Sequence, residues 1–288
     1  MRDSRSLFLE LRGLRYHVRH WPGQSDRRIF LLHGWMDVSA SFQFMVDAMD
    51  AGWDLYAPDW RGFGLTAWGP SDSYAFTDYV ADLDQLLEHL QPEAPVNLVG
   101  HSLGGNAAAM YAGTRPERVA RLVNLEGFGM GRTQPEQAPA RLRRFLDELR
   151  APPRLRAYPN FSALADRLQK NNPRLNRARA EFLAEHWGQL SGDGEVHLRS
   201  DPAHKMVNAT LSRVEEWRAF WQAIEAPVLW VDAADSATPV QLKISPEEMA
   251  DRRQAYRQLR HVTVQNAGHM LHHDQPEMVA ALIEEFLS

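Results

Sequence analysis

The sequence contains no cysteine among its 288 residues. This absence excludes disulfide scaffolding, catalysis by a thiolate and metal sites built from thiolates. A chain without cysteine suits a reducing compartment, and we expect a cytoplasmic protein.

Long apolar runs and blocks of basic residues are also missing. No apolar stretch approaches the roughly 20 residues of a membrane-spanning helix, so no membrane association is expected. Residues 1–6 lead into only a short apolar run, which does not fit a signal peptide. The net charge of −5 argues against nucleic acid as a partner. We expect a small-molecule substrate and a monomer or homodimer.

Apolar residues make up 44% and charged residues 24% of the chain, as in a globular protein with a full core. Short apolar runs alternate with segments of helical periodicity. The runs 29–32, 119–125 and 227–231 are typical of strands covered on both faces. The segments 77–90 and 276–287 have the spacing of amphipathic helices. This alternation predicts an α/β fold with a mostly parallel sheet flanked by helices.

The alternation stops after residue 130. Residues 131–222 contain helix-like segments rich in arginine and proline and no buried-strand run. We therefore predict a core made of residues 1–130 and 223–288, with 131–222 inserted as a helical cap. Its apolar positions, such as Leu142 and Leu146, recur at helical spacing, so we expect one face to pack on the core and enclose a pocket.

An apolar run ends in Gly100-His101-Ser102-Leu103-Gly104 and continues into a helix of small residues. This is the G-x-S-x-G pattern in its strand–turn–helix context, where the turn exposes the serine above the sheet. A Cβ at Gly100 or Gly104 would collide with a neighbouring strand or helix. The Leu103 N–H, at the new helix's N-terminus, would face a developing oxyanion. Ser102 is the candidate nucleophile.

A serine needs a base and an orienting carboxylate, which should follow it along such a chain. The base is predicted to be His269, because Gly268 directly before it lets the loop turn the ring inward. His272 and His273 are nearby alternatives. Three carboxylates follow predicted strands: Asp235 is favoured as the acid, with Glu126 and Asp232 as alternatives.

The loop after the strand at 29–32 should supply the second oxyanion donor. Gly34 lets the backbone approach the substrate, so the Trp35 N–H is the expected donor. The side chain of His33 is expected to brace this loop by hydrogen bonds. Candidates for the substrate pocket are His33, Gly34, Glu126, Phe128 and Met130.

From about Phe30 onward the chain resembles an α/β-hydrolase of the capped, serine hydrolase or esterase type. The pieces that carry the resemblance are His33-Gly34, Gly100-His101-Ser102-Leu103-Gly104, Asp235 and Gly268-His269. Relatives that act on epoxides or haloalkanes have an aspartate at the position of Ser102, so both activities are excluded here.

The resemblance implies a serine hydrolase that cleaves a small to medium carboxylic ester through an acyl-enzyme, with no metal and no cofactor. One alternative is a hydrolase that uses the same residues to cleave a C–C bond in a diketone. Another is a ligand-binding protein of the same fold that turns over no substrate.

Overall fold

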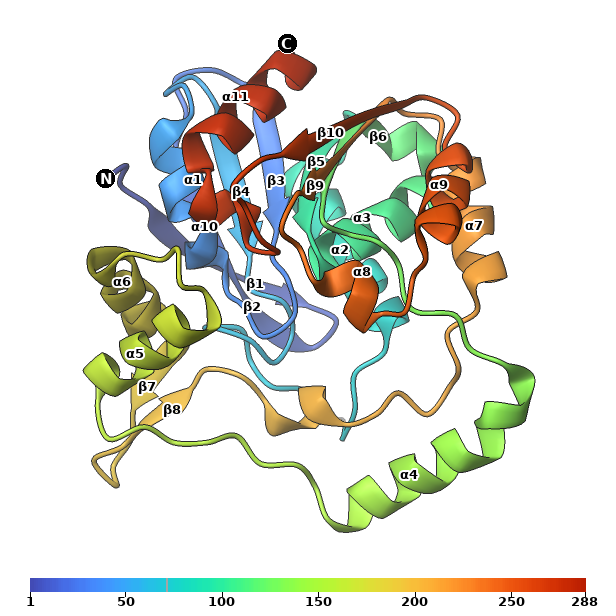
Figure 1. The fold of residues 1–288 in the computed structure, drawn as a ribbon. Helices are drawn as coiled ribbons and strands as arrows, with labels where there is room; N and C mark the ends of the chain where they lie inside the picture. The colour runs from blue at the N-terminus through green and yellow to red at the C-terminus, as the bar shows by residue number, and fades with distance from the viewer. Residues whose placement is uncertain (71) are drawn as a thin grey trace.

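An eight-stranded sheet in the order β1-β2-β4-β3-β5-β6-β9-β10 forms the centre of the protein (Figure 1). The computed structural model describes residues 1–70 and 72–288. β1 and β2 pair antiparallel, and β2 pairs antiparallel with β4, whereas the strands from β4 to β10 run parallel. The strands are β1 (Arg5–Leu11), β2 (Leu14–Trp21), β3 (Arg28–Leu32), β4 (Asp54–Pro58), β5 (Val96–His101), β6 (Val119–Leu125), β9 (Val228–Ala233) and β10 (Leu259–Val264). The predicted, mostly parallel α/β sheet is confirmed.

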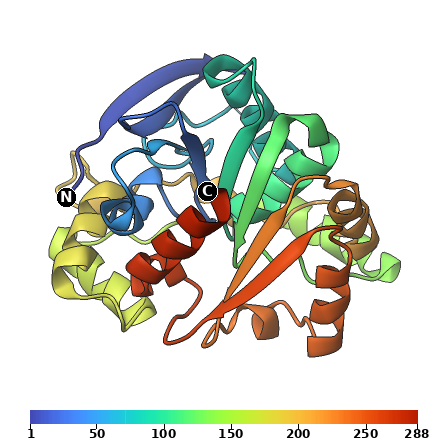
Figure 2. The same ribbon diagram turned by 90° about the horizontal axis from the view of Figure 1, so that it is seen from above.

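Helices cover both faces of the sheet (Figure 2). Because side chains alternate along a strand, Phe30 and Leu32 join one apolar cluster and Ile29 and Leu31 join the other. The first cluster includes residues of α2 (Phe76–Leu90), α3 (Leu103–Thr114) and α9 (Pro246–Gln254), and the second includes α1 (Gln43–Ala48), α10 (Leu271–Asp274) and α11 (Pro276–Leu287). Among the described residues, no helix combines the length and apolar character needed to cross a bilayer.

The inserted segment below the sheet in Figure 1 is not uniform. Its α5 (Phe161–Asn171) and α6 (Arg177–Trp187) pack with a short hairpin, β7 (Gly188–Leu190) and β8 (Val196–Leu198), around a small apolar cluster of their own. The hairpin was not expected in a helical cap. Its strands are only three residues each, too short to show a strand pattern in the sequence.

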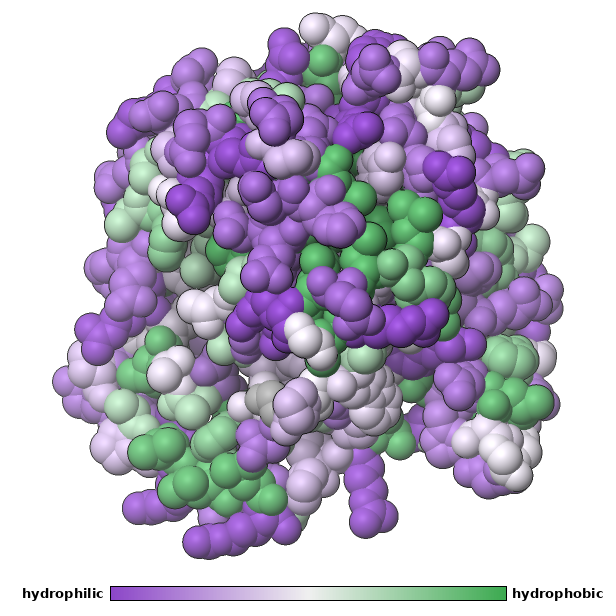
Figure 3. Space-filling view, turned by 180° about the vertical axis from the view of Figure 1, so that it is seen from behind, coloured by the Kyte–Doolittle hydropathy of each residue, from purple (hydrophilic) through white to green (hydrophobic). Residues whose placement is uncertain are grey.

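The first helix of the insert, α4 (Ala138–Arg150), buries no residue. Leu142 is 48% exposed and Leu146 46% exposed, and apolar side chains gather over this helix at the lower left of Figure 3. The expectation that this apolar face packs on the core is therefore wrong. Helical spacing shows that a helix has an apolar face, but it does not place another surface against that face.

The last helix of the insert, α7 (Val214–Ala223), lies against α3. Trp217 and Trp221 join the apolar cluster on the α3 side of the sheet. At Gly113 the two helices approach so closely that a Cβ would lie under 3.0 Å from the Phe220 carbonyl oxygen. By its packing α7 belongs to the helix layer of the core, although residues 214–222 fall inside the predicted cap boundary.

Replacing Gly113 with alanine should destabilise the protein. In an open helix this change would stabilise by about 0.5–1 kcal/mol, because glycine loses more backbone freedom on folding. Here the added methyl group meets a backbone carbonyl of α7, and such overpacking costs about 1–3 kcal/mol. Urea denaturation measures the free energy of unfolding. Gly192→Ala is the control, since a Cβ there meets nothing within 4 Å. A Gly113→Ala variant as stable as the wild type would contradict the close packing of α7 on α3.

Candidate active site

Ser102 lies at the turn between β5 and α3 in a strained backbone conformation, with φ of 51° and ψ of −112°. Cβ atoms built on Gly100 and Gly104 would collide with backbone atoms, at Gly100 those of Gly104 and at Gly104 those of Leu32. Only glycine leaves room for this approach of helix to strand. The collision expected from the sequence is therefore confirmed, and the turn holds the serine side chain at the carboxyl end of the sheet.

His269 reaches the serine from the loop that follows β10. Its Nε2 lies 3.0 Å from Oγ of Ser102. The carbonyl oxygen of His269 accepts a hydrogen bond from Nε2 of His101 at 2.8 Å, which fixes the loop beside β5. The structure thus brings together the two residues that the sequence pointed to as nucleophile and base.

The carboxylate bonded to His269 belongs to Glu126, at the end of β6. Its Oε2 lies 3.1 Å from Nδ1 of His269 and also accepts the hydroxyl of Ser236. Its Oε1 accepts the Ala233 backbone N–H at 2.7 Å. The side chain is fully buried, and φ of Glu126 is 57°, a left-handed conformation that turns the residue out of the strand.

Asp235, which the sequence favoured as the orienting acid, lies elsewhere. Its side chain is 51% exposed and forms an ion pair with Arg174 of the cap at 2.6 Å. The carboxylate of the other alternative, Asp232, forms an ion pair with Arg253, and its Oδ2 lies 2.9 Å from Nε2 of His261. The expectation for Asp235 is corrected to Glu126, because the loop after β9 directs Asp235 outward to a cap arginine.

The loop after β3 lies directly against the nucleophile. A Cβ on Gly34 would lie 3.3 Å from Cβ of Ser102. Trp35 follows, and its indole donates to the His204 carbonyl at 3.1 Å. On the other side of Ser102, Leu103 is the first residue of α3, where a helix leaves its N–H without an intrahelical partner. Both backbone segments expected to donate to an oxyanion therefore flank the serine.

His33 is buried and holds this loop in place. The Trp60 backbone N–H donates to Nε2 of His33 at 2.9 Å, so Nδ1 carries the proton and donates to the Gly34 carbonyl at 2.8 Å. Burial lowers the pKa of His33 to about 4, so the ring stays neutral at physiological pH. The bonds match the bracing role expected from the sequence.

Asp59 is a buried residue of this region that sequence reasoning missed. Its carboxylate accepts the N–H groups of Ser39 at 2.6 Å and Leu65 at 2.9 Å, and it pairs with His17 at 2.7 Å. Although burial alone would raise the pKa of Asp59, these bonds hold it well below its ordinary value. The only signal in the sequence was its place at a strand end, where many loops carry aspartate.

A cavity of about 610 Å³ opens at the start of α3, bordered by Trp35, Leu103 and Met130, the second of which directly follows Ser102. Of the predicted pocket residues Met130 lines this cavity, whereas His33, Gly34, Glu126 and Phe128 do not. The Phe128 side chain is buried in the core, with its ring centroid 6.1 Å from that of Trp230. The apolar wall of the cavity also includes Phe76, Met110, Trp217 and Phe220. Four cationic side chains and one anionic side chain line it as well: Arg132, Arg141, Arg213, Lys243 and Glu216.

Comparisons with known proteins agree with this architecture. The serine hydrolase-like protein of Danio rerio is 28% identical over 96% of this chain and 85% of its own. The sn-1-specific diacylglycerol lipase ABHD11 of Mus musculus is 26% identical over 90% of this chain and 80% of its own. A solved thioesterase domain from the curacin biosynthetic pathway superimposes with a TM-score of 0.88 at 24% identity, covering 98% of this chain and 99% of that one. That likeness concerns the fold.

The family model for the alpha/beta hydrolase fold matches residues 27–276, which include the serine turn, the buried glutamate and the histidine loop. The chain belongs to the α/β-hydrolase family.

Proposed function

We propose that the protein is a serine hydrolase that cleaves carboxylic esters through an acyl-enzyme, with Ser102, His269 and Glu126 as its catalytic residues. The observation that carries the proposal is the unbroken chain of hydrogen-bonding contacts from Oγ of Ser102 through the imidazole to a buried carboxylate, at 3.0 Å and 3.1 Å. This is the arrangement that makes a serine hydroxyl nucleophilic.

In the first half of the reaction His269 takes the Ser102 proton at Nε2 while Oγ attacks the ester carbonyl. The Trp35 and Leu103 N–H groups stabilise the oxyanion that forms. The Glu126 carboxylate accepts a hydrogen bond from the Nδ1–H of His269 and stabilises the imidazolium, and the proton stays on Nδ1. The imidazolium then protonates the leaving alcohol. In the second half, the same histidine activates water, which releases the acid and restores the serine.

The position of Glu126 suits an orienting acid. Its second oxygen is fixed by the Ala233 N–H and its side chain is buried, so the carboxylate cannot turn away from His269. A fixed acceptor holds the proton on Nδ1 and leaves Nε2 free to accept from the serine.

The cavity lining supports an ester whose acyl part carries a negative charge. Its walls are mainly apolar near Trp35 and Met130. Arg141 and Lys243 also line it; Arg141 interacts electrostatically with Glu148 of the same helix. An apolar chain ending in a carboxylate would match both features. The volume of about 610 Å³ is that of a site for a small to medium substrate.

The first prediction from this proposal concerns the nucleophile. Ser102→Ala should abolish labelling by a fluorophosphonate and lower kcat for p-nitrophenyl acetate by roughly 10³-fold or more, since nucleophile and base act as a unit. In-gel fluorescence measures the labelling, and the release of p-nitrophenol followed by absorbance measures kcat. Labelling that persists in the alanine variant would contradict the assignment. Wild-type protein that folds but neither reacts with the probe nor hydrolyses the ester would favour a non-catalytic binding protein.

The second prediction separates the acids. Glu126→Gln keeps an oxygen for the Ala233 N–H but presents an amide to His269, so kcat should fall about 10²–10⁴-fold. Asp235→Asn is the matched control: it breaks an exposed ion pair, which should change kcat by less than about fivefold. A larger loss in Asp235→Asn than in Glu126→Gln would restore Asp235 as the acid.

The third prediction compares two esters of matched shape, p-nitrophenyl succinate and p-nitrophenyl 4-methylpentanoate. After subtraction of spontaneous hydrolysis, kcat/KM should favour the anionic ester by roughly two- to fivefold at low salt. The preference should shrink in about 0.5 M NaCl, where charges are screened over a few ångströms. It should also fall in the double variant Arg141→Gln, Lys243→Gln, but not in Arg143→Gln, on the same helix outside the cavity. Equal rates in the wild type would exclude the charged acyl group.

The alternative, hydrolysis of a C–C bond in a diketone, uses the same residues and is tested on the same protein. A panel of p-nitrophenyl esters and dienoic diketones should show turnover of the esters at the higher kcat/KM. The reverse order would make the protein a C–C hydrolase.

A further inference from the structure

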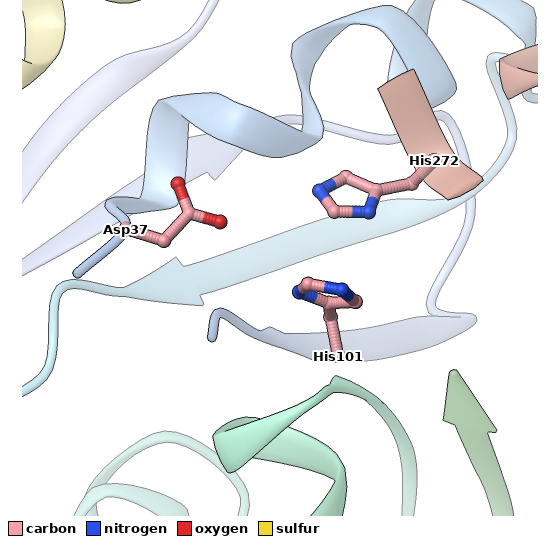
Figure 4. A group of neighbouring side chains, drawn as sticks. All are labelled: Asp37, His101 and His272. Atoms are coloured by element: carbon pink, nitrogen blue, oxygen red, sulfur yellow. The ribbon is translucent and has the colours of Figure 1, made fainter. Parts of the chain in front are cut away.

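Three buried polar atoms behind the serine have no hydrogen-bond partner among the described residues: Oδ2 of Asp37, Nδ1 of His101 and Nδ1 of His272. The residues are only 2%, 1% and 0% exposed. Figure 4 shows the carboxylate and the two rings facing a common space. Potential ligand atoms of the three residues all lie within 4.8 Å of one another. Buried polar groups left unpaired are costly, so three together need a common partner.

The hydrogen bonds of the two rings show what kind of partner fits. Nε2 of His101 lies 2.8 Å from the His269 carbonyl, which can only accept, so the proton of a neutral His101 is on Nε2 and Nδ1 presents a lone pair. Nε2 of His272 lies 3.2 Å from the Ser41 hydroxyl, which also lies 2.6 Å from Nε2 of His273. Where this hydroxyl donates to His273 and accepts a hydrogen bond from His272, Nδ1 of His272 is left as a lone pair. Burial lowers the pKa of both histidines well below the ordinary value, which keeps both rings neutral.

The third group is an acid without a counter-charge. Oδ1 of Asp37 accepts the Val38 N–H at 2.8 Å, and the Ser41 and Trp187 side chains lie beside the carboxylate as neutral donors. No cationic side chain is paired with it among the described residues. Two neutral imidazole nitrogens and a carboxylate oxygen, all acting as electron-pair donors, are the ligands of a divalent transition metal ion.

We propose that Asp37, His101 and His272 bind a divalent transition metal ion, with Zn²⁺ as the ion that best suits the donor set. Zinc sites with two histidines and one carboxylate place N and O ligands about 2.0–2.2 Å from the metal, so the ligand atoms would be about 3.4 Å apart. The present spacing, within 4.8 Å, is wider than that, so binding would require the three side chains to draw together. A water molecule completes the four ligands.

The three ligands lie close in sequence to proposed functional groups. Asp37 follows Trp35 by two residues in the loop after β3, His101 ends β5 directly before Ser102, and His272 lies in α10, three residues after His269. A bound ion would join these three segments from behind without entering the ester reaction, which needs no metal. The expected consequence is therefore higher stability, because a ligand that binds only the folded state raises Tm.

The test uses full-length protein stripped with EDTA and then dialysed against ZnCl₂. Wild-type protein should retain one equivalent by metal analysis, its Tm should rise by roughly 5 °C or more, and Mg²⁺ should do neither. Co²⁺ should give the visible absorption bands of a tetrahedral site with nitrogen ligands. Asp37→Asn and His272→Gln should each lose the bound equivalent and the Tm shift. Thermal unfolding of these two variants without metal verifies that they fold.

A second group, Asp193, Glu195 and His197, is exposed on the cap hairpin and could also take up metal. His197→Gln is therefore the matched control and should still bind one equivalent. Ser102→Ala should bind like the wild type, which separates this proposal from the proposed hydrolase function. The proposal would be overturned by any of three results: the wild type retains no metal, both Asp37→Asn and His272→Gln retain it unchanged, or His197→Gln loses it.

Discussion

The close approach of backbone to backbone at Gly100 and Gly104 is the constraint on which the rest of the site depends. Because neither residue has a Cβ, α3 can begin immediately beside β3 and β5. That proximity forces Ser102 into a left-handed conformation and places the first N–H groups of α3 next to its side chain. A bulkier residue at either glycine would push α3 away from the sheet. Both the Ser102 hydroxyl and the backbone N–H of Leu103 would then move out of position.

The strand order then decides which loops can meet at this turn. β5 lies between β3 and β6 in the sheet. The loop after β3 therefore approaches from one side and Glu126, at the end of β6, from the other. β10 lies two strands beyond β6, so the histidine must cross the ends of β6 and β9 to reach the serine. This longer path explains the buried bonds that fix the histidine loop to β5.

The parts of the structure that depend on local sequence could be predicted, and those that depend on packing between distant segments could not. The sheet, Ser102 and His269 each follow from apolar runs or from glycines next to the residue. Glu126 and Asp235 both follow a strand and precede the histidine, so their local sequences are equivalent. What separates them is Arg174, which reaches Asp235 from the cap.

The same reason explains why the expected packing of two helices in the predicted cap, α4 and α7, was wrong. The apolar spacing of α4 and α7 is similar in kind, yet α4 buries nothing and α7 buries two tryptophans against the core. Periodicity describes one helix at a time. It cannot show which of two apolar faces finds a partner, because the partner lies some 100 residues earlier in α3.

The contacts of the cap divide it into an anchored half and a free half. Asn172 and Arg179, at α5 and α6, bond to Asp274 at 2.7 Å and to the His273 carbonyl at 2.9 Å, and Asp274 in turn accepts the Gly268 N–H beside the histidine. Moving α5 and α6 would therefore disturb the histidine loop. Moving α4, which borders the cavity through Arg141, would break the 2.6 Å hydrogen bond from the Val207 N–H to Glu148 but would expose no buried residue of this helix. A displacement of α4 would therefore widen the cavity on this side and leave the bonds that hold the histidine loop in place.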